Sequence, residues 1–375
     1  MKKGFVKLIA LLLILSLLLP SVLAATPEGM VEDSLFFGFD GNETPAQGWT
    51  QTRKGQPSTI GPDTALYTKN GFLTVSYVYN ETTLVEYTEA TGYTLKAEDR
   101  FEIGEMPWLL SRSMRYSLEA GGKRLRPSML LAAVEMLGGD VEDALDFACA
   151  VEMIHTYSLI HDDLPGMDDD TLRRGRPTNH VVFGVGQAIL AGDGLLNGAF
   201  ETMLNHACAR PERAARYLSA IREIAAGAGV TGMIGGQAMD LHCERSGIAD
   251  THALEYIQYG KTACMFIHPL RAAAMLCGAG EDDVKALTDY GRAFGLLFQA
   301  TDDLLDVVGS QADVGKTLGK DAESGKLTCV SAYGIEGTRE RVTRLHGEAL
   351  AAIARFGEKA AFFRELVDAM VDRTK

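Results

Sequence analysis

The sequence lacks several features that mark other classes of protein. Its 36 Lys and Arg residues face 50 Asp and Glu, so the net charge of −14 argues against nucleic acid as a partner. After residue 25, no stretch is long and apolar enough to span a bilayer. Metal-type cysteine spacing is also absent, so we expect buried free thiols at the six cysteines, which are Cys149, Cys208, Cys243, Cys264, Cys277 and Cys329.

The N-terminus has the pattern of a secretory signal. Three lysines fall within the first seven residues, an apolar run covers 9–19, and small residues over 21–25 form a cleavage site. We expect a signal-like leader over residues 1–25, with an uncleaved membrane anchor as the alternative. The free thiols instead favour a reducing compartment. The leader therefore predicts export or membrane association, whereas the free thiols predict a cytoplasmic location for the rest of the chain.

Residues 26–106 have the composition of a small β-rich segment. Turn residues separate short runs that are rich in aromatic and β-branched side chains, namely Leu35–Phe39, Phe72–Tyr79 and Thr83–Tyr87. We expect these runs to be strands of a β-sandwich or jelly-roll-like module. No catalytic constellation occurs in this segment, so we expect a structural or weak binding role.

From Met106 onward, strand signals nearly vanish and Ala, Leu, Met and Gly dominate. Apolar residues recur at helical spacing over 128–137, 144–160, 185–207, 214–228, 254–277, 284–308 and 339–354. We therefore predict a single all-α bundle with short connections over residues 107–375.

An acidic cluster follows the mostly apolar run 148–160. Five aspartates fall within nine residues, from Asp162 to Asp170, and Arg173 and Arg174 come shortly after. Clustered carboxylates suit Mg²⁺, or alternatively Mn²⁺, because hard cations prefer oxygen ligands and Mg²⁺ shares them with phosphate and water. Arginine side chains match the geometry of phosphate. The cluster therefore predicts a site for a metal and a phosphorylated ligand.

A second acidic cluster follows the apolar run 293–298. Asp302 and Asp306 are four residues apart, so one helical face carries both, with Gln299 three residues before. Either cluster alone could be a solvated helix end, but two such clusters in one chain predict a diphosphate–Mg²⁺ site with two walls. The expected metal ligands are Asp162, Asp163, Asp168, Asp302, Asp303 and Asp306.

The two clusters resemble the aspartate-rich motifs of the trans-isoprenyl diphosphate synthases, the polyprenyl synthetase family. Four further stretches match the family in order and spacing, at 121–127, 236–241, 260–262 and 325–326. The resemblance covers residues 109–375, and the four-residue spacer 164–167 is closest to the bacterial-type short-chain farnesyl diphosphate synthases. It implies an all-α prenyltransferase bundle around a central cavity, which agrees with the helical periodicity.

The resemblance also implies roles for residues at matching positions. His155 lies seven residues before Asp162 on one helical face. A lone histidine there is more often a core residue, but the family uses one at this position to hold isopentenyl diphosphate. The implied substrate-binding residues are Lys123, Arg126, His155, Arg173, Arg174, Lys261, Thr262, Gln299, Lys316 and Lys326. Among these, Lys261, Thr262 and Gln299 are also the expected catalytic residues.

The implied reaction condenses isopentenyl diphosphate with an allylic diphosphate, dimethylallyl or geranyl. The allylic C–O bond ionises, the isopentenyl double bond attacks, and the released diphosphate removes the proton, with water excluded. Tyr157 and the adjacent Ser158 lie at the chain-length position, where a bulky ring favours the C15 product, farnesyl diphosphate. The C20 product, geranylgeranyl diphosphate, is the nearest competitor.

The N-terminal part departs from the family. Only Trp108–Leu118 has family-like helical texture, so the first family helices are missing or replaced, and the homodimer expected from the family depends on that region. Three alternatives stay open: a class I terpene cyclase, a non-catalytic prenyltransferase-like subunit, and a surface or fusion protein that works through its β-rich segment. The intact aspartate motifs favour the synthase over all three.

Overall fold

The computed structural model describes five strands between residues 58 and 95 by their backbone, residues 106–248, 250–308 and 326–371 with their side chains, and residue 372 by its backbone. The predicted leader, the run 35–39 and Lys316 lie outside the described residues. The strands are β1 (Ser58–Gly61), β2 (Thr64–Lys69), β3 (Phe72–Tyr79), β4 (Thr82–Thr88) and β5 (Gly92–Leu95). The two strand predictions that fall on described residues, 72–79 and 83–87, coincide with β3 and β4.

The five strands form one antiparallel sheet in sequential order, β1-β2-β3-β4-β5. In the β2–β3 pair, Leu66 lies opposite Val75, and in the β3–β4 pair Val75 lies opposite Tyr87. Each strand pairs antiparallel with the next strand along the chain, so the sheet is a meander. The prediction of a sandwich is not met among the described residues, which contain a single sheet here and no second layer.

The rest of the described chain is helical, as predicted. The helices are α2 (Trp108–Leu118), α3 (Leu125–Met136), α4 (Leu145–Asp162), α5 (Asn179–Phe183), α6 (Val185–Ala209), α7 (Ala214–Ala228), α8 (Met233–Ser246), α9 (Thr251–Ile257), α10 (Cys264–Cys277), α11 (Glu281–Val308), α14 (Cys329–Ile353) and α15 (Ala361–Asp372). None of these described helices is long and apolar enough to cross a bilayer.

Three features of the helical region differ from the prediction. Helices α5, α8 and α15 were not expected; α5 has only five residues, and α8 is rich in polar residues and glycine. The run predicted as one helix over 254–277 is instead α9, a π-helix at Gln258–Ala263, and α10. A short hairpin of two-residue strands, β6 (Leu172–Arg173) and β7 (Arg176–Pro177), follows the first acidic cluster.

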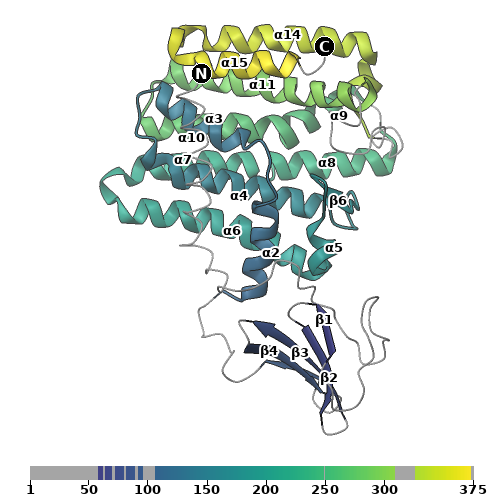
Figure 1. Cartoon of the computed structure of the whole chain (residues 1–375). Coiled ribbons are helices and arrows are strands. Elements are labelled where there is room, and N and C mark those ends of the chain that lie inside the picture. Colours follow the sequence, from purple (N-terminus) through teal and green to yellow (C-terminus); the bar gives the residue numbers. More distant parts are fainter. Residues whose placement is uncertain are drawn as a thin grey trace.

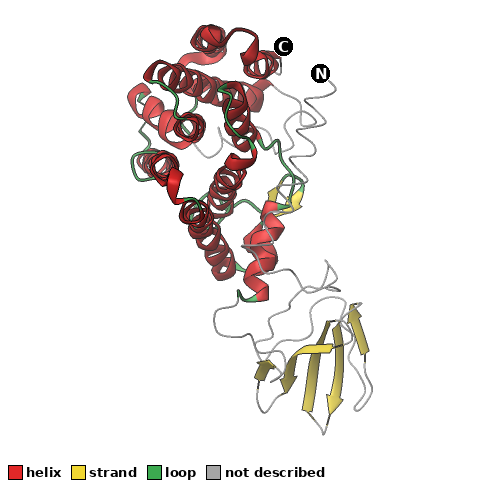
Figure 2. Ribbon diagram, turned by 90° about the vertical axis from the view of Figure 1, so that its left-hand side faces the viewer, coloured by secondary structure: helices red, strands yellow, loops and turns green. Residues whose placement is uncertain are grey.

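The helices stack in layers, with α14 and α15 on one side, α11 and α10 next to them, and α4 and α6 towards the other side (Figure 1). In the turned view, many of the helices are seen nearly end-on (Figure 2). Helix α4 is apolar all round, and 12 of its 18 residues are buried, as expected for a helix packed on every side. The last residue of α4, Asp162, is therefore a carboxylate at the end of a mostly buried helix.

Glycines bring the π-helix close to two of its neighbours. A Cβ on Gly236 of α8 would collide with the backbone of Lys261. A Cβ on Gly295 of α11 would lie 2.5 Å from Ala263 Cα. These two contacts place α8 and α11 directly against the segment that carries Lys261 and Thr262.

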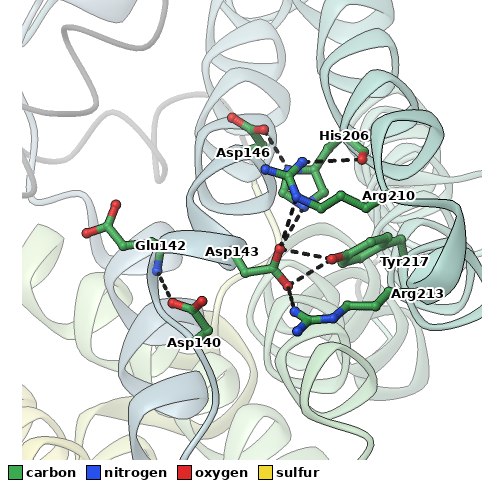
Figure 3. A network of polar contacts seen from close by, with 8 residues as sticks. All are labelled: Asp140, Glu142, Asp143, Asp146, His206, Arg210, Arg213 and Tyr217. Atoms are coloured by element: carbon green, nitrogen blue, oxygen red, sulfur yellow. Dashed lines mark hydrogen bonds and ion pairs between the residues drawn. The ribbon is translucent and has the colours of Figure 1, made fainter.

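A polar network ties together the opposite end of the bundle (Figure 3). Asp143, before α4, accepts hydrogen bonds from the Tyr217 hydroxyl at 2.9 and 3.0 Å and from Arg213 Nη1 at 3.1 Å. His206 of α6 lies between two carboxylates, with Nε2 3.2 Å from Asp143 and Nδ1 2.8 Å from Asp146. This network joins the start of α4 to α6 and α7, and it lies far from the two acidic clusters because α4 separates them.

Candidate active site

The loop after α4 folds back on the end of the helix. Asp162 is the last helical residue, and the Asp168 backbone N–H donates to the Asp162 carbonyl at 2.9 Å. The loop therefore returns the backbone of Asp168 to the end of α4, next to the backbone of Asp162. Burial raises the pKa of Asp162, Lys261 opposes this rise, and Asp168 adds to it. A partly desolvated carboxylate beside a second one favours a bound cation.

Asp163 has a different environment from Asp162. Its side chain is 4% exposed, and Arg173 Nε donates to both carboxylate oxygens at 2.8 and 2.9 Å. Arg173 Nη2 lies 2.6 Å from Oδ1 of the same carboxylate. The two adjacent aspartates thus separate into one that lies beside Asp168 and one that anchors the β6 strand through Arg173.

Two lysines reach the first acidic cluster. Lys326 Nζ lies 3.1 Å from Asp168 Oδ1. Lys261 Nζ lies 2.7 Å from Asp240 Oδ2 of α8. Burial lowers the pKa of Lys261, but Asp162 and Asp240 together raise it above the ordinary value, so this lysine is charged at neutral pH. The cluster therefore combines carboxylates that suit a metal with ammonium groups that suit a diphosphate.

The second cluster carries a chain of hydrogen bonds. Thr262 Oγ1 donates to Gln299 Oε1 at 2.9 Å, and Gln299 Nε2 donates to Asp303 Oδ1 at 2.8 Å. Asp303 is 3% exposed, and its Oδ2 accepts from the Cys329 backbone N–H at 2.7 Å and from Gln258 Nε2 at 3.3 Å. The oxygens of Asp303 are thus occupied by protein donors. Because Nε2 of Gln299 is directed at a carboxylate, its Oε1 must face Thr262.

Arg126 of α3 connects the two clusters. Its guanidinium lies over the Phe266 ring, 4.5 Å from the centroid, and Nη1 is 3.4 Å from His155 Nε2. Burial lowers the pKa of Arg126 to about 10, and Glu152 and Asp302 oppose this shift. Burial is the main cause that lowers the pKa of His155 well below 6.5, and the positive charge of Arg126 is the next. The imidazole is therefore neutral. Arg126 on α3 thus lies within electrostatic range of Asp302 on α11 and touches His155 on α4.

The basic turn before α3 has the special backbone that its glycines predict. Gly122 has φ +120°, and a Cβ there would lie 2.6 Å from the Arg174 guanidinium carbon. Arg174 Nη1 also donates to the Gly121 carbonyl. The structure therefore brings Arg174 to this turn, next to the exposed Lys123.

Tyr157 lies on α4 five residues before Asp162, about 7.5 Å along the helix axis at a rise of 1.5 Å per residue. The side chain is buried, and its ring stands edge-on to His161 at 5.7 Å between centroids. The hydroxyl is buried without a hydrogen-bond partner among the described residues. Burial, followed by the charge of Asp162, raises the pKa of Tyr157 to about 12. The adjacent Ser158 Oγ instead donates to the His155 carbonyl at 2.8 Å.

Three residues of this region were not anticipated. Asp240 pairs with Lys261, Gln258 anchors Asp303, and Glu152 pairs with Arg124 across the basic turn. Asp240 lies in one of the matching stretches, at 236–241, and this was a usable signal. Gln258 and Glu152 lie within helical segments, and only tertiary contact shows their partners.

An all-α bundle with two acidic clusters, approached by lysine and arginine side chains, defines a class of enzymes: the prenyltransferases, which act on isoprenyl diphosphates. The family profile described as polyprenyl synthetase matches residues 107–361. The chain belongs to this family.

Relatives and solved structures agree with this assignment. The chain is 43% identical to "Geranylgeranyl pyrophosphate synthase, chloroplastic" of Capsicum annuum, over 73% of this chain and 74% of that protein. It is 42% identical to "Farnesyl diphosphate synthase" of Bacillus subtilis (strain 168), over 72% of this chain and 90% of that protein. A crystal structure of an FPP/GFPP synthase from Zymomonas mobilis superposes with a TM-score of 0.64 and 36% identity, covering 73% of this chain and 93% of the other.

Proposed function

We propose that this chain condenses isopentenyl diphosphate with dimethylallyl or geranyl diphosphate and releases farnesyl diphosphate. One observation carries the proposal: Arg126 contacts His155, on the helix that ends in Asp162, and also lies within electrostatic range of Asp302 on α11. A site of this kind holds negative charge on two walls and cations between them. It suits two diphosphates bound together with divalent cations.

The residues present fit Mg²⁺. Asp162 and Asp168 lie side by side, and burial raises the pKa of Asp162, so a cation there would offset an unfavourable charge. No three histidine, cysteine or carboxylate ligands converge on one point in the described ranges. Mg²⁺ needs no such convergence, because it is usually held by one or two carboxylates together with phosphate and water.

We assign the ligand role to the four carboxylates Asp162, Asp168, Asp302 and Asp306. Asp163 and Asp303 are positioning residues in this proposal, because their oxygens accept hydrogen bonds from Arg173 and from Gln299, Gln258 and Cys329. Bound Mg²⁺ would neutralise the diphosphate of the allylic substrate and make it a better leaving group.

The cationic side chains divide between the two substrates in this proposal. Lys123, Arg126 and Arg174 lie on or against the basic turn and would bind isopentenyl diphosphate, with the neutral His155 as a hydrogen-bonding partner. Lys261, Lys326 and, by resemblance, Lys316 would bind the allylic diphosphate. Arg173 acts indirectly in this arrangement, since it holds Asp163.

The oxygen dipoles of the second wall would stabilise the allylic cation. The Thr262 hydroxyl donates a hydrogen bond to Gln299 Oε1, so the oxygen lone pairs of Thr262 can face positive charge that develops at C1 of the allylic group. The isopentenyl double bond then attacks C1, and the departing diphosphate takes the proton that the resulting carbocation loses, which forms the double bond of the new allylic product. Apolar side chains such as Phe266 keep water away from the cation.

Product length is the finer part of the proposal. A buried tyrosine five residues before Asp162 supports a C15 limit, because in this proposal its bulky ring would block the extension of a longer chain. Geranylgeranyl diphosphate is the second candidate, because several relatives carry the name geranylgeranyl pyrophosphate synthase. We also propose that the chain acts as a homodimer and that its helical region works in the cytoplasm, with the role of the leader open.

The test uses the full chain with Mg²⁺, isopentenyl diphosphate and geranyl diphosphate, and it resolves products by chain length. We expect a C15 product that falls at least about a hundredfold in Asp162→Asn and in Asp302→Asn, because each removes charge that holds the metal. Asp282→Asn is the matched control, since its side chain is 84% exposed on α11, and it should keep full activity. A C20 product would overturn the chain-length assignment, and no product from folded protein would overturn the synthase assignment.

A further inference from the structure

Arg341 of α14 reaches back across a bend in its own helix. At Gly334 the backbone leaves the helical conformation, with φ +68°, a value that favours glycine. The Arg341 guanidinium lies over the ring of Tyr333, 5.5 Å from its centroid. Because Tyr333 comes before the bend and Arg341 after it, this contact joins the two parts of α14. The part before the bend begins at Cys329, whose backbone N–H donates to Asp303.

The same guanidinium fixes the orientation of a buried amide. Arg341 Nη2 donates to Gln258 Oε1 at 3.4 Å, and Gln258 is 2% exposed. A guanidinium has donors only, so the amide oxygen must face it and the amide nitrogen must face away. Gln258 Nε2 is thereby directed at Asp303 Oδ2 at 3.3 Å and at Cys329 Sγ at 3.0 Å. An amide turned the other way would place its oxygen against the carboxylate of Asp303, which repels it.

Two chains of hydrogen bonds therefore meet at the carboxylate of Asp303. One chain runs from Arg341 through Gln258 to Oδ2. The other runs from Thr262 through Gln299 to Oδ1. A carboxylate held at both oxygens cannot rotate, so the chain that begins at Arg341 restrains the chain that ends at Thr262.

We propose that Arg341 is a positioning residue for the prenyl transfer and that it acts through Gln258. By keeping the Gln258 amide on Asp303, it keeps that carboxylate in place, and with it Gln299 and the Thr262 oxygen. This inference rests on the proposed function, because it takes Thr262 to face the positive charge of the allylic group. A loss of orientation raises the barrier of the chemical step without weakening the binding of either diphosphate, so it lowers kcat and leaves KM unchanged.

The test measures kcat and KM of the full-length protein with Mg²⁺, isopentenyl diphosphate and geranyl diphosphate. We expect Arg341→Gln to lower kcat about tenfold at unchanged KM for both substrates, because a glutamine can donate or accept and does not fix the neighbouring amide. Arg341→Lys keeps a group that only donates, so it should retain most of the wild-type kcat. Arg339→Gln is the matched control, since it makes the same change at an exposed arginine of α14 that pairs with Glu336, and it should keep the wild-type kcat.

A double variant separates positioning from packing on Tyr333. If Arg341 acts through Gln258, adding Arg341→Gln to Gln258→Met changes nothing, and the double variant has the kcat of Gln258→Met alone. Effects on kcat that multiply in the double variant, a wild-type kcat in Arg341→Gln, or a raised KM at unchanged kcat would overturn the inference.

Urea unfolding checks that each variant is folded at the assay temperature. Where Arg341→Gln does not fold, Arg341→Lys decides, and a folded Arg341→Lys with a kcat about tenfold below wild type would overturn the inference. Wild-type protein that forms no product would overturn the proposed function and this inference together, whereas normal wild-type turnover isolates the failure to Arg341.

Discussion

The substitution Asp303→Asn tests whether the second aspartate of the α11 motif is a metal ligand or an anchor that holds neighbouring groups by hydrogen bonds. Asp303 accepts hydrogen bonds from Gln299 Nε2 at 2.8 Å, from the Cys329 N–H at 2.7 Å and from Gln258 Nε2 at 3.3 Å. In Asp303→Asn, the oxygen can stay on Cys329 and Gln258, and the new amide nitrogen then meets the Gln299 nitrogen. Gln299 must turn its amide over, which puts a nitrogen where Thr262 now finds an oxygen.

The size of the effect follows from the three hydrogen bonds. Hydrogen bonds to charged groups contribute about 1.5–3 kcal/mol each and neutral ones about 0.5–1.5 kcal/mol, so each bond weakens by about 1 kcal/mol. We expect Asp303→Asn to lower the free energy of unfolding by about 3 kcal/mol. That is a large part of the 5–15 kcal/mol typical of folded proteins.

The assay is urea unfolding combined with steady-state kinetics over a range of Mg²⁺ concentrations. Asp302→Asn is the matched control, because it makes the same chemical change one residue earlier on a half-buried side chain. We expect Asp303→Asn to lose stability and kcat while the Mg²⁺ concentration for half-maximal rate stays unchanged. Asp302→Asn should lose less stability and require more Mg²⁺. A higher Mg²⁺ requirement in Asp303→Asn, at wild-type stability, would refute the assignment of Asp303 as an anchor.

Two further predictions follow from the same structure. Tyr157→Ala should shift product length from C15 to C20 or longer and cost about 3–5 kcal/mol of stability, as large-to-small core changes do. Tyr157→Phe should keep both product and stability, because the hydroxyl has no partner among the described residues. Chromatography of the products and urea unfolding check this, and a C15 product from Tyr157→Ala would contradict it. Burial raises the pKa of Asp143, but hydrogen bonds from Tyr217 and His206 outweigh it and hold that pKa below its ordinary value. This carboxylate therefore adds stability above the pKa of the unfolded chain, near 4, and the contribution is lost as the pH falls through the lower folded pKa. Asp143→Asn should be less stable than wild type at pH 7, and by thermal unfolding this deficit should shrink as the pH is lowered towards 3; an equal deficit at both pH values would count against this reasoning.

Much of the fold was readable from local pattern. The helical period predicted an all-α body, and the predicted run at Trp108–Leu118 coincides with α2. The segment at 254–277 was harder, because a π-helix differs from an α-helix by one hydrogen-bond register and leaves no periodicity signal of its own. It lies in close contact with Gly236 and Gly295, and these contacts join segments far apart in the chain.

Strand prediction shows a similar limit. Alternation identified β3 and β4 within a residue of their bounds, because the period of two is local. Whether neighbouring strands form one sheet or two depends on which faces meet, and the described strands form a single meander rather than a sandwich.

The sequence by itself determined the family, the helical body and the places where carboxylates cluster at helix ends, because all three follow from residue order and spacing. It could not separate Asp162 from Asp163, or Asp302 from Asp303, since each pair has identical letters in adjacent positions. Successive residues on a helix point about 100° apart, so one member of each pair faces a hydrogen-bonding partner that only the folded chain supplies. Tertiary packing made Asp163 and Asp303 buried anchors, because the hairpin that carries Arg173 folds back on the first and the start of α14 at Cys329 reaches the second.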